Sequence, residues 1–550
     1  MVQGRSVSPL TSSRSIQRVV QTWQRRSRET SRSLGVLTAR LNVFGAVRVP
    51  ALHEALLWAG VLDRAPASWD DAPVVEKMPW GAGRFPAPPV TPPEGITGPW
   101  PQPAAVDPRF YAPVLNVPAE DRRDHVRYIV SRYLGQLVSE VPGAALRALQ
   151  RGRLVGVDDA EFTHILTETS FGQFVCPELD DATRADFAAV LAPEGAYGRM
   201  DFSVCPAEHL LPGMHAEPVV VLVQRLEDRW TVPALRVGRR VVTPADGDTW
   251  ALAKCFTLLA AQTRLVGASH PRIHFPADVI NAVTRSVLPA THPIYQLIAP
   301  HTRFTLGLHE AVIHHRRSSI HNSQHELYNG FPYRTEGMHE LVATGNTGVE
   351  GNSAWGAYRF GDEFVGDHVA YGRYRRAWRD AWEGFAAEAL ARVDARDPVV
   401  RAWADHIAAW LPGFPDGNAI AEGDALSRAV ATYLACVTTF HTADHHSFAN
   451  IALEKMPWRI RKPFPQEGSA PAYDLDTLVT PEDSFRARLA HSMFFRPAVI
   501  TSLRDITYNF SHPDERAAAL RWQATMSALD AQWQGSGFPR ADEIASGVHY

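Results

Sequence analysis

The chain has 550 residues, of which 45% are hydrophobic, 21% charged and 10% aromatic, and its formal net charge is −4 at neutral pH. This composition is typical of a folded globular protein and excludes a disordered, collagen-like or coiled-coil chain, and the length suits one large unit or two lobes. The weak net charge gives no field that attracts nucleic acid, and no apolar run is long enough for a membrane span. We therefore expect no nucleic-acid partner and no membrane span, and no feature of the sequence indicates a partner protein.

The first part of the chain differs in composition from the rest. Residues 1–40 form a basic segment with eight arginines, one acidic residue and many serines, and they lack the apolar core of a secretory signal. An organelle transit peptide and an exposed basic helix both fit this segment, and we expect a cytoplasmic protein. Residues 81–108 are dense in proline and glycine, which excludes a helix and predicts an extended strap that crosses the surface.

Beyond residue 120 the sequence has a mainly helical pattern, in which apolar residues recur at three- or four-residue intervals. The helices that this periodicity predicts cover residues 122–149, 371–393, 399–411, 424–448 and 513–534. The predicted strands cover residues 218–222, 230–237 and 240–243. The predicted fold class is therefore mainly α, a large helical body with a small β element.

Histidine is unusually frequent, with 23 residues, and the first informative pair is His270 and His274. Both continue an apolar stripe that begins at Leu252, so they face the core side of a predicted helix. Their spacing of four places two imidazoles on the same side of adjacent turns, where both can bind one metal ion. Two core histidines hydrogen-bonded to carbonyl groups would give the same pattern. Pro271 predicts a kink here because it removes a backbone donor.

The second pair, His441 and His445, ends another core-facing stripe, which follows a predicted N-cap at Asp424. Burying four imidazoles is costly unless each lone pair finds a partner, and one divalent ion would satisfy all four. The four cysteines lie far apart without a CxxC pair, so thiolate ligands are not expected. A mainly imidazole site suits iron, manganese, copper or zinc.

Three stretches around these histidines resemble elements of the lipoxygenase family. VVTPADGDTWALAK (241–254) is similar to the family's TPxDxxxWxLAK, LPATHPIYQLIAPHTRFT (288–305) to HPIYKLLxPHxRYT, and CVTTFHTADHHS (436–447) to TASxxHAAVN or TxxQHASVH. They occur in the same order and with closely similar spacing. The resemblance implies a single lipoxygenase-like catalytic domain over residues 41–550, built around long central helices, without the N-terminal β-sandwich that many members carry.

The resemblance also implies the ligands of one non-heme iron per chain, with manganese as the alternative metal. His270, His274 and His441 occupy the positions of the family's three iron-binding histidines. His445 falls where the family has a fourth histidine or an asparagine. The C-terminal carboxylate is the last ligand in that family, which makes Tyr550 the candidate here.

Two features depart from the family pattern. The family's first pair is H-x4-H, a spacing accommodated by a π-type bulge, whereas this chain has H-x3-H, which needs only α geometry. A register that uses His446 and Asn450 as an H-x-x-x-N pair is an alternative to His441 and His445. If the shorter spacing and the terminal Tyr550 abolish metal binding, the chain is a non-catalytic relative.

The segment that lines the fatty-acyl channel in the family is polar in this chain. It reads LGLHEAVIHHRRSSIHNSQHELY (306–328), with Ala311 or Val312 near the family's small-residue position, so both are candidate substrate-binding residues. Its histidines include another i, i+4 pair, His321 and His325. For that pair, a second metal site and a solvated surface are the two interpretations.

Arg459 and Arg461 follow the second histidine helix and are further candidates for substrate binding, since a guanidinium pairs well with a substrate carboxylate. The alternative interpretation is that both are solvated charges on the surface. The resemblance implies a dioxygenase that inserts O2 into the 1,4-pentadiene unit of a polyunsaturated fatty acid to give a hydroperoxide. It implies no catalytic group beyond a metal-bound hydroxide. The polar segment favours a second interpretation, a metal oxygenase of the same fold that acts on a more polar substrate.

Overall fold

The structure is a computed structural model, and the residues that it describes are 101–107, 112–115, 121, 125–126, 128, 154–227, 229–274, 278–313, 330–347, 366–409, 411, 413–451, 453–491, 495 and 501–548. Several predicted features lie outside these residues: the basic segment 1–40, residues 81–100 of the strap, most of the helix 122–149, His321, His325 and Tyr550. The described part of the strap is strand β1 (Pro101–Asp107), which forms an antiparallel hairpin with β2 (Ala112–Leu115).

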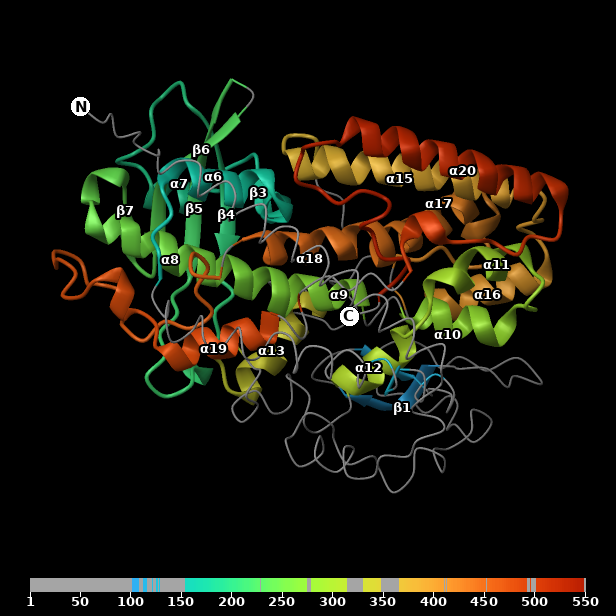
Figure 1. Cartoon of the computed structure of the whole chain (residues 1–550), viewed down its shortest axis with the longest axis horizontal. Helices are drawn as coiled ribbons and strands as arrows, with labels where there is room; N and C mark the ends of the chain where they lie inside the picture. Colours follow the sequence, from blue (N-terminus) through green and yellow to red (C-terminus); the bar gives the residue numbers. More distant parts are fainter. Residues whose placement is uncertain are drawn as a thin grey trace, which may run out of the picture.

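Two long helical segments cross the middle of the molecule and carry the two histidine pairs (Figure 1). The first consists of α8 (Asp248–Gln262), the π-helix η6 (Thr263–Ser269) and α9 (His270–His274). The second consists of α17 (Ala425–Ala435), the π-helix η9 (Cys436–Phe440) and α18 (His441–Asn450). A five-stranded sheet lies at one end of these segments, and a group of helices lies at the other (Figure 1). That group contains α10 (Asp278–Val287), α11 (Pro293–Ile298), α15 (Ala370–Ala389), α16 (Pro398–Ala408) and α20 (Pro513–Gln532). The mainly α architecture with a small β element confirms the predicted fold class.

The sheet is an antiparallel meander in the order β3-β4-β5-β6-β7. Its strands are β3 (Val175–Cys176), β4 (Ala196–Phe202), β5 (Val219–Leu226), β6 (Arg229–Val237) and β7 (Arg240–Val242). The last three match the predicted strands. Strand β4 was not predicted, because its buried positions alternate with arginine and aspartate and one of them is a glycine.

The first central segment begins at a capped turn and runs through the core. Thr243 and Asp246 form a capping box ahead of α8, and α8 is buried on almost every side, as suits a helix inside a large core. Helix α13 (Thr335–Thr347) packs directly against η6. A Cβ atom on Gly345 of α13 would lie only 1.7 Å from the carbonyl oxygen of Ala268, so this close approach requires glycine.

Both central segments change from π- to α-helix immediately before a histidine, at His270 and at His441. The spacing from His270 to His274 is α-helical, as expected, but the two π-helices were not predicted. Pro271 lies just after the first change, where its missing N–H coincides with the altered hydrogen-bond pattern. Asp424 is the N-cap of α17, although its side chain makes no capping hydrogen bond.

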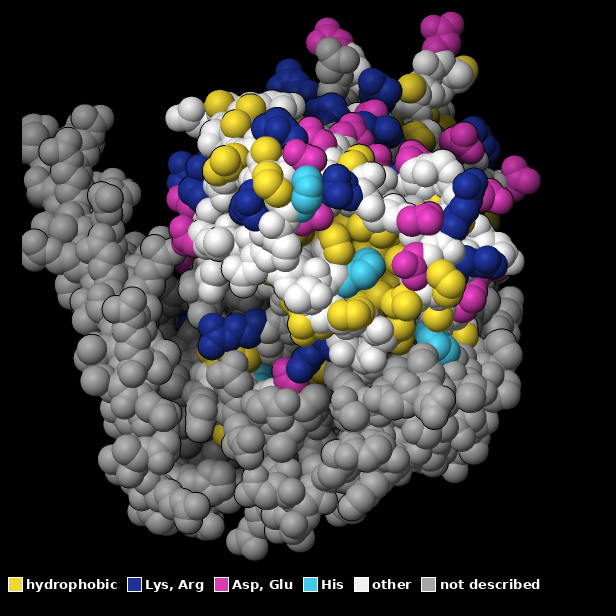
Figure 2. All heavy atoms as spheres, turned by 90° about the vertical axis from the view of Figure 1, so that its right-hand side faces the viewer, with side chains coloured by type: hydrophobic (Ala, Val, Ile, Leu, Met, Phe, Trp, Pro, Cys, Tyr) yellow, Lys and Arg dark blue, Asp and Glu magenta, His cyan; other side chains and the backbone are white. Residues whose placement is uncertain are grey.

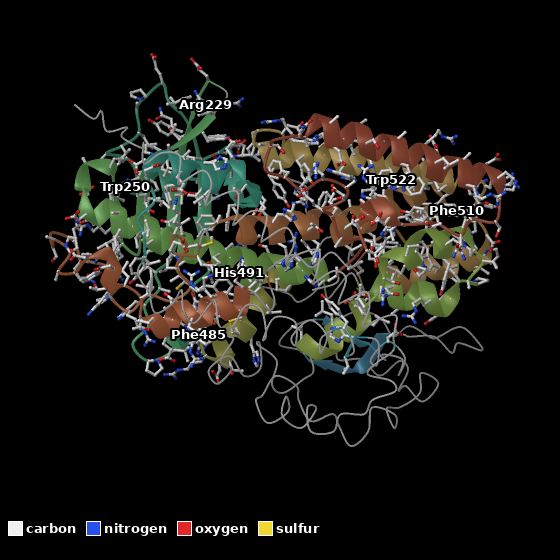
Figure 3. The ribbon with its side chains drawn as sticks, in the orientation of Figure 1. Arg229, Trp250, Phe485, His491, Phe510 and Trp522 are labelled. Carbon is white, nitrogen blue, oxygen red and sulfur yellow. The ribbon has the colours of Figure 1, made fainter. Side chains whose placement is uncertain are left out.

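An aromatic cluster joins α15 to α20 at the helical end of the molecule. Trp382 lies with its ring centroid 4.3 Å from that of Trp522, and Phe385 stacks on Trp522 at 5.1 Å with an interplanar angle of 7°. Figure 3 labels Trp522 and Phe510 at this end, and Trp250 near the sheet at the other. Rings of this size remove large apolar areas from water, so the cluster stabilises the helices that support the second histidine pair.

The face at the α11 and α16 end carries basic and acidic side chains intermixed with apolar ones (Figure 2). This mixture agrees with the weak net charge of the chain. Among the helices that the structure describes, none combines the length and the apolar character needed to cross a bilayer.

Candidate metal centre

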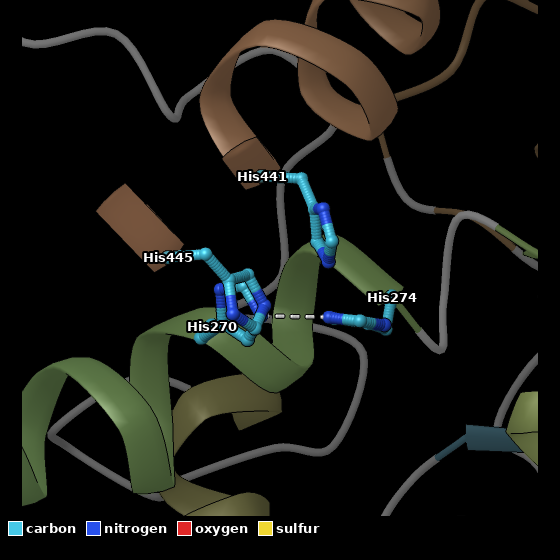
Figure 4. Close-up of side chains that lie close together, drawn as sticks. All are labelled: His270, His274, His441 and His445. Atoms are coloured by element: carbon cyan, nitrogen blue, oxygen red, sulfur yellow. Dashed lines mark hydrogen bonds between the residues drawn. The ribbon is translucent and has the colours of Figure 1, made fainter. Parts of the chain in front are cut away.

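The two central segments bring His270, His274, His441 and His445 together at the middle of the molecule (Figure 4). One ring nitrogen of each histidine lies within 4.8 Å of one ring nitrogen of every other. All four side chains are buried, with relative exposures of 0% to 7%. Helix α9 supplies the first pair and α18 the second, so the spacing of four in each helix places both imidazoles on the side that faces the other helix.

The distances between the ring nitrogens suit neighbouring ligands of one metal ion. The Nε2 atom of His270 lies 2.8 Å from Nε2 of His274 and 2.9 Å from Nε2 of His445. Imidazole ligands at about 2.1 Å from one ion and at right angles to each other have nitrogens about 3 Å apart. Three of the four histidines therefore already have the spacing of adjacent coordination positions.

The hydrogen-bond partners of Nδ1 in His270 and His445 indicate the tautomer of each ring. Nδ1 of His270 lies 3.1 Å from Oδ2 of Asp444, and Nδ1 of His445 lies 2.9 Å from the carbonyl oxygen of Phe495. Neither acceptor has a proton to give, so each Nδ1 carries a hydrogen and donates it outward. The Nε2 atoms of the two rings face each other at 2.9 Å, and one metal ion bound by both would satisfy their lone pairs.

The electrostatics of His274 agree with a ligand role. Burial, together with the nearby His270 and His309, lowers the pKa of His274 well below its ordinary value. The ring therefore stays neutral, which is the form that binds a metal ion. The positions of the four histidines and the neutral form of His274 thus fit a divalent transition-metal ion, and imidazole donors suit iron or manganese among others.

The chain leading to its last residues runs beside this group. The backbone N–H of Ala545 donates to Oγ1 of Thr442 at 3.1 Å, and Thr442 is the residue after His441. Nδ1 of His301 donates to the carbonyl oxygen of Ser546 at 2.5 Å. A side chain at Gly547 would meet the carbonyl oxygen of His301 at 2.3 Å, so the tail is held closely. Tyr550 itself lies outside the described residues, and its role as a ligand stays a prediction.

The alternative register places its residues differently. His446 does not belong to the group of converging nitrogens, and burial lowers its pKa. The side chain of Asn450 lies outside the described residues. Among the described side chains, the arrangement thus brings His441 and His445 to the first histidine pair.

Two of the predicted substrate-binding residues lie on a helix, and the other two lie in the loop that follows α18. Val312 is half-buried on α12 (Thr305–Ile313), and the side chain of its neighbour Ala311 lies outside the described residues. Arg459 is buried and its Nε donates to the carbonyl oxygen of Phe331 at 3.0 Å; burial lowers its pKa to about 10. Arg461 forms two hydrogen bonds with the carboxylate of Asp483, at 2.7 and 2.8 Å. Both guanidinium groups thus have protein partners, and their role toward a substrate stays a prediction.

One residue of the site escaped the sequence analysis, the buried acid Asp444. It lies on α18 between the two histidines of that helix and contacts His270 on α9. The signal that could have found it is a charged residue inside a segment whose other features predict burial. A buried carboxylate needs donors around it, and a histidine is one of the donors available.

A fold with two central helices that each carry a buried histidine pair is that of a lipoxygenase-like catalytic domain. Comparison with known proteins supports this conclusion through structure rather than sequence, because no family model and no curated protein matches the chain. Solved structures to which it is similar include lipoxygenases from a coral and from fungi. Their sequence identities to this chain are 12% to 15%, so the likeness shows the fold.

Three of these structures illustrate the similarity. Manganese lipoxygenase of Gaeumannomyces graminis is 12% identical, with a TM-score of 0.62 over 80% of this chain and 94% of that one. Coral 8R-lipoxygenase is 15% identical, with a TM-score of 0.59 over 81% and 78%. The fungal lipoxygenase of Fusarium graminearum is 14% identical, with a TM-score of 0.54 over 72% and 80%. The chain therefore has the lipoxygenase fold that its sequence elements predicted.

Proposed function

We propose that this protein is a lipoxygenase-type dioxygenase that binds one non-heme iron, or manganese in its place, through His270, His274, His441 and His445. The observation that carries the proposal is the convergence of four buried imidazoles, two of which have Nε2 atoms 2.9 Å apart and donate outward from Nδ1. The lipoxygenase fold around them supports the assignment of the reaction class. Such a site with an open coordination position suits catalysis better than a purely structural role.

The terminal carboxylate of Tyr550 is the further ligand that we propose. Support comes from the buried stretch before it, whose Ala545 is hydrogen-bonded to the neighbour of His441. A free carboxylate binds iron or manganese readily whatever side chain its residue has.

The residues of the chain have defined tasks in this proposal. When bound, the metal supplies one-electron redox chemistry toward a polyunsaturated fatty acid and O2. The four imidazoles hold it, and the carbonyl oxygen of Phe495 fixes the tautomer of His445. The ring of Phe495 stacks along His445 with centroids 6.4 Å apart, and Phe440, the residue before His441, is 1% exposed. An apolar surrounding of this kind limits the access of water to the site.

Ala311 and Val312 on α12 are the side chains that we propose to contact the acyl chain. Arg459 and Arg461 would bind the substrate carboxylate only by exchanging their present partners, Asp483 in the case of Arg461. A more polar substrate is the alternative that the sequence of residues 306–328 favours.

The test is oxygen uptake and conjugated-diene absorbance with linoleate and longer polyunsaturated fatty acids, using protein loaded with iron or manganese. We expect turnover in the wild type and none in His441→Ala. His446→Ala removes a histidine from the same helix outside the group, and it should keep turnover. Metal-loaded protein without turnover on any such fatty acid would contradict the fatty-acid proposal, and turnover of polar dienes or phenols instead would favour the alternative. Loss of turnover in His446→Ala alone would favour the other register.

A further inference from the structure

Asp444 occupies a position that ordinary packing would give to an apolar residue. Its side chain is 1% exposed and lies between the two metal-binding positions of α18. In the family elements that this helix resembles, HAAVN and HASVH, the corresponding residue is valine. Burying a carboxylate there is unfavourable unless hydrogen-bond donors satisfy its oxygens.

The carboxylate of Asp444 is satisfied by donors from three other elements. Oδ2 accepts from Nδ1 of His270 on α9 at 3.1 Å. Oδ1 accepts from the hydroxyl of Tyr371 on α15 at 3.2 Å and from Nε2 of Gln173, in the 3-10 helix η3 (Ser170–Phe174), at 3.3 Å. Burial and the charge of Asp444 raise the pKa of Tyr371 well above its ordinary value, so the phenol keeps its proton and donates.

A buried cation, Arg375, lies beside one of these donors, Tyr371. Arg375 is 3% exposed, and its guanidinium carbon lies 4.0 Å from the ring centroid of Phe440 and 5.5 Å from that of Tyr371. The donors on α9, α15 and η3 therefore satisfy the buried carboxylate of Asp444, which contacts Nδ1 of His270 while Nε2 of the same ring faces His274 and His445.

We propose that Asp444 is a positioning residue of the metal site, which holds His270 with its Nε2 lone pair toward the ion and places negative charge behind the ring. The inference rests on the proposed function, because it needs a metal ion at the four histidines. A carboxylate hydrogen-bonded to a ligand imidazole makes the ring a better donor. The consequence is tighter binding of a divalent ion and a lower reduction potential of bound iron, because the added negative charge favours the ferric state.

The chain contains a matched pair for comparison. Asp278 and His309 form the same contact, with Nδ1 and Oδ2 3.1 Å apart, and both side chains are buried. His309 does not belong to the group of converging nitrogens. Asp278→Asn therefore replaces a buried carboxylate that contacts an imidazole outside the group of four histidines.

The experiment measures two quantities on the full chain: the affinity for Co2+, followed by its visible absorption, and the reduction potential of the iron-loaded protein. Asp444→Asn keeps an oxygen that accepts from His270 but removes the charge. We expect roughly 10- to 100-fold weaker Co2+ binding and a higher potential. Asp278→Asn should change both quantities much less than Asp444→Asn does.

Tyr371→Phe provides a second variant with the opposite expected sign. It removes one donor from Asp444 while keeping the ring, so the carboxylate is less neutralised and the potential should fall. Opposite shifts of the reduction potential in Asp444→Asn and Tyr371→Phe would support the proposal, because a general loosening of the fold would not produce them. If Asp444→Asn does not fold, the shift in Tyr371→Phe decides, and an unchanged potential overturns the inference.

The outcomes separate the inference from the function on which it rests. Wild-type protein that binds neither Co2+ nor iron overturns the metal site itself. Wild-type protein that binds both, with Asp444→Asn equal to it in affinity and potential, overturns only the role of Asp444.

Discussion

His301 provides a quantitative prediction about acid stability. Its side chain is fully buried; Nδ1 donates to the carbonyl oxygen of Ser546, and Nε2 accepts from the hydroxyl of Tyr508 at 3.0 Å. Burial lowers the pKa of His301 from 6.5 to about 4, outweighing the hydrogen bond to Ser546. Between these two values the unfolded chain binds a proton that the folded protein does not. The free energy of unfolding therefore decreases as the pH falls from about 6.5 to about 4.

The size of this loss follows from the two pKa values. Their difference is about 2.5 pH units, and each unit corresponds to about 1.4 kcal/mol, so His301 accounts for about 3 kcal/mol of acid destabilisation. His301→Asn places a neutral amide near Nδ1, which can still donate to Ser546. The variant should be less stable than the wild type at pH 7, and this deficit should shrink by up to about 3 kcal/mol at pH 4 because the variant has no imidazole to protonate.

The assay is urea denaturation at half-unit steps from pH 7 to pH 4, for the wild type and His301→Asn. Other histidines, such as the half-buried His406, whose pKa burial also lowers to about 4, are present in both proteins and cancel in the difference. His164→Gln, at an exposed position of α6 (Asp159–Glu168), is the control for removing one histidine. If the wild type and His301→Asn lose stability in parallel over this pH range, the reasoning about His301 is refuted.

Two further predictions concern contacts that support the central segments. Gly345→Ala puts a Cβ 1.7 Å from the carbonyl oxygen of Ala268, so the free energy of unfolding, measured by urea denaturation, should fall by about 1–3 kcal/mol. The control Gly384→Ala has open space around it and should raise the free energy of unfolding by up to about 1 kcal/mol; equal stabilities of the two variants would contradict the close packing of α13. The ammonium of the buried Lys254 lies 2.7 Å from Oδ1 of Asp159, and Asp159→Ala removes this partner, so the free energy of unfolding should fall by about 1–3 kcal/mol. The double variant Asp159→Ala with Lys254→Met should recover much of this loss. Stability losses of the two substitutions that simply add would refute the coupling between the two side chains.

Much of the fold was predictable because its signals are local and periodic. The pattern over residues 371–393 and 513–534 predicted α15 and α20 to within a few residues, since each helix buries one continuous stripe. The lipoxygenase-like architecture was predictable from three sequence elements, although no family model matches the chain. The convergence of the two histidine pairs followed from their equal spacing on two core-facing stripes.

The features that were missed depend on contacts between distant parts of the chain. The π-helices η6 and η9 have no local sequence signal; η6 accompanies the close packing of α13, which a single-helix pattern does not contain. Asp444 was overlooked because a charged residue is usually solvated, and only the folded chain places Tyr371 and His270 around it. The spacing of residues in the sequence does not show that distant side chains will satisfy a buried charge.

The central claim is that four histidines hold one metal ion, and metal content tests it most directly. Elemental analysis of the purified full chain, before and after anaerobic reconstitution with Fe2+ or Mn2+, should be made for the wild type and His441→Ala together. We predict about one iron or manganese per wild-type chain and almost none in His441→Ala, with both proteins folded by circular dichroism. Wild-type protein without metal after reconstitution, or equal metal in the two proteins, would contradict the account.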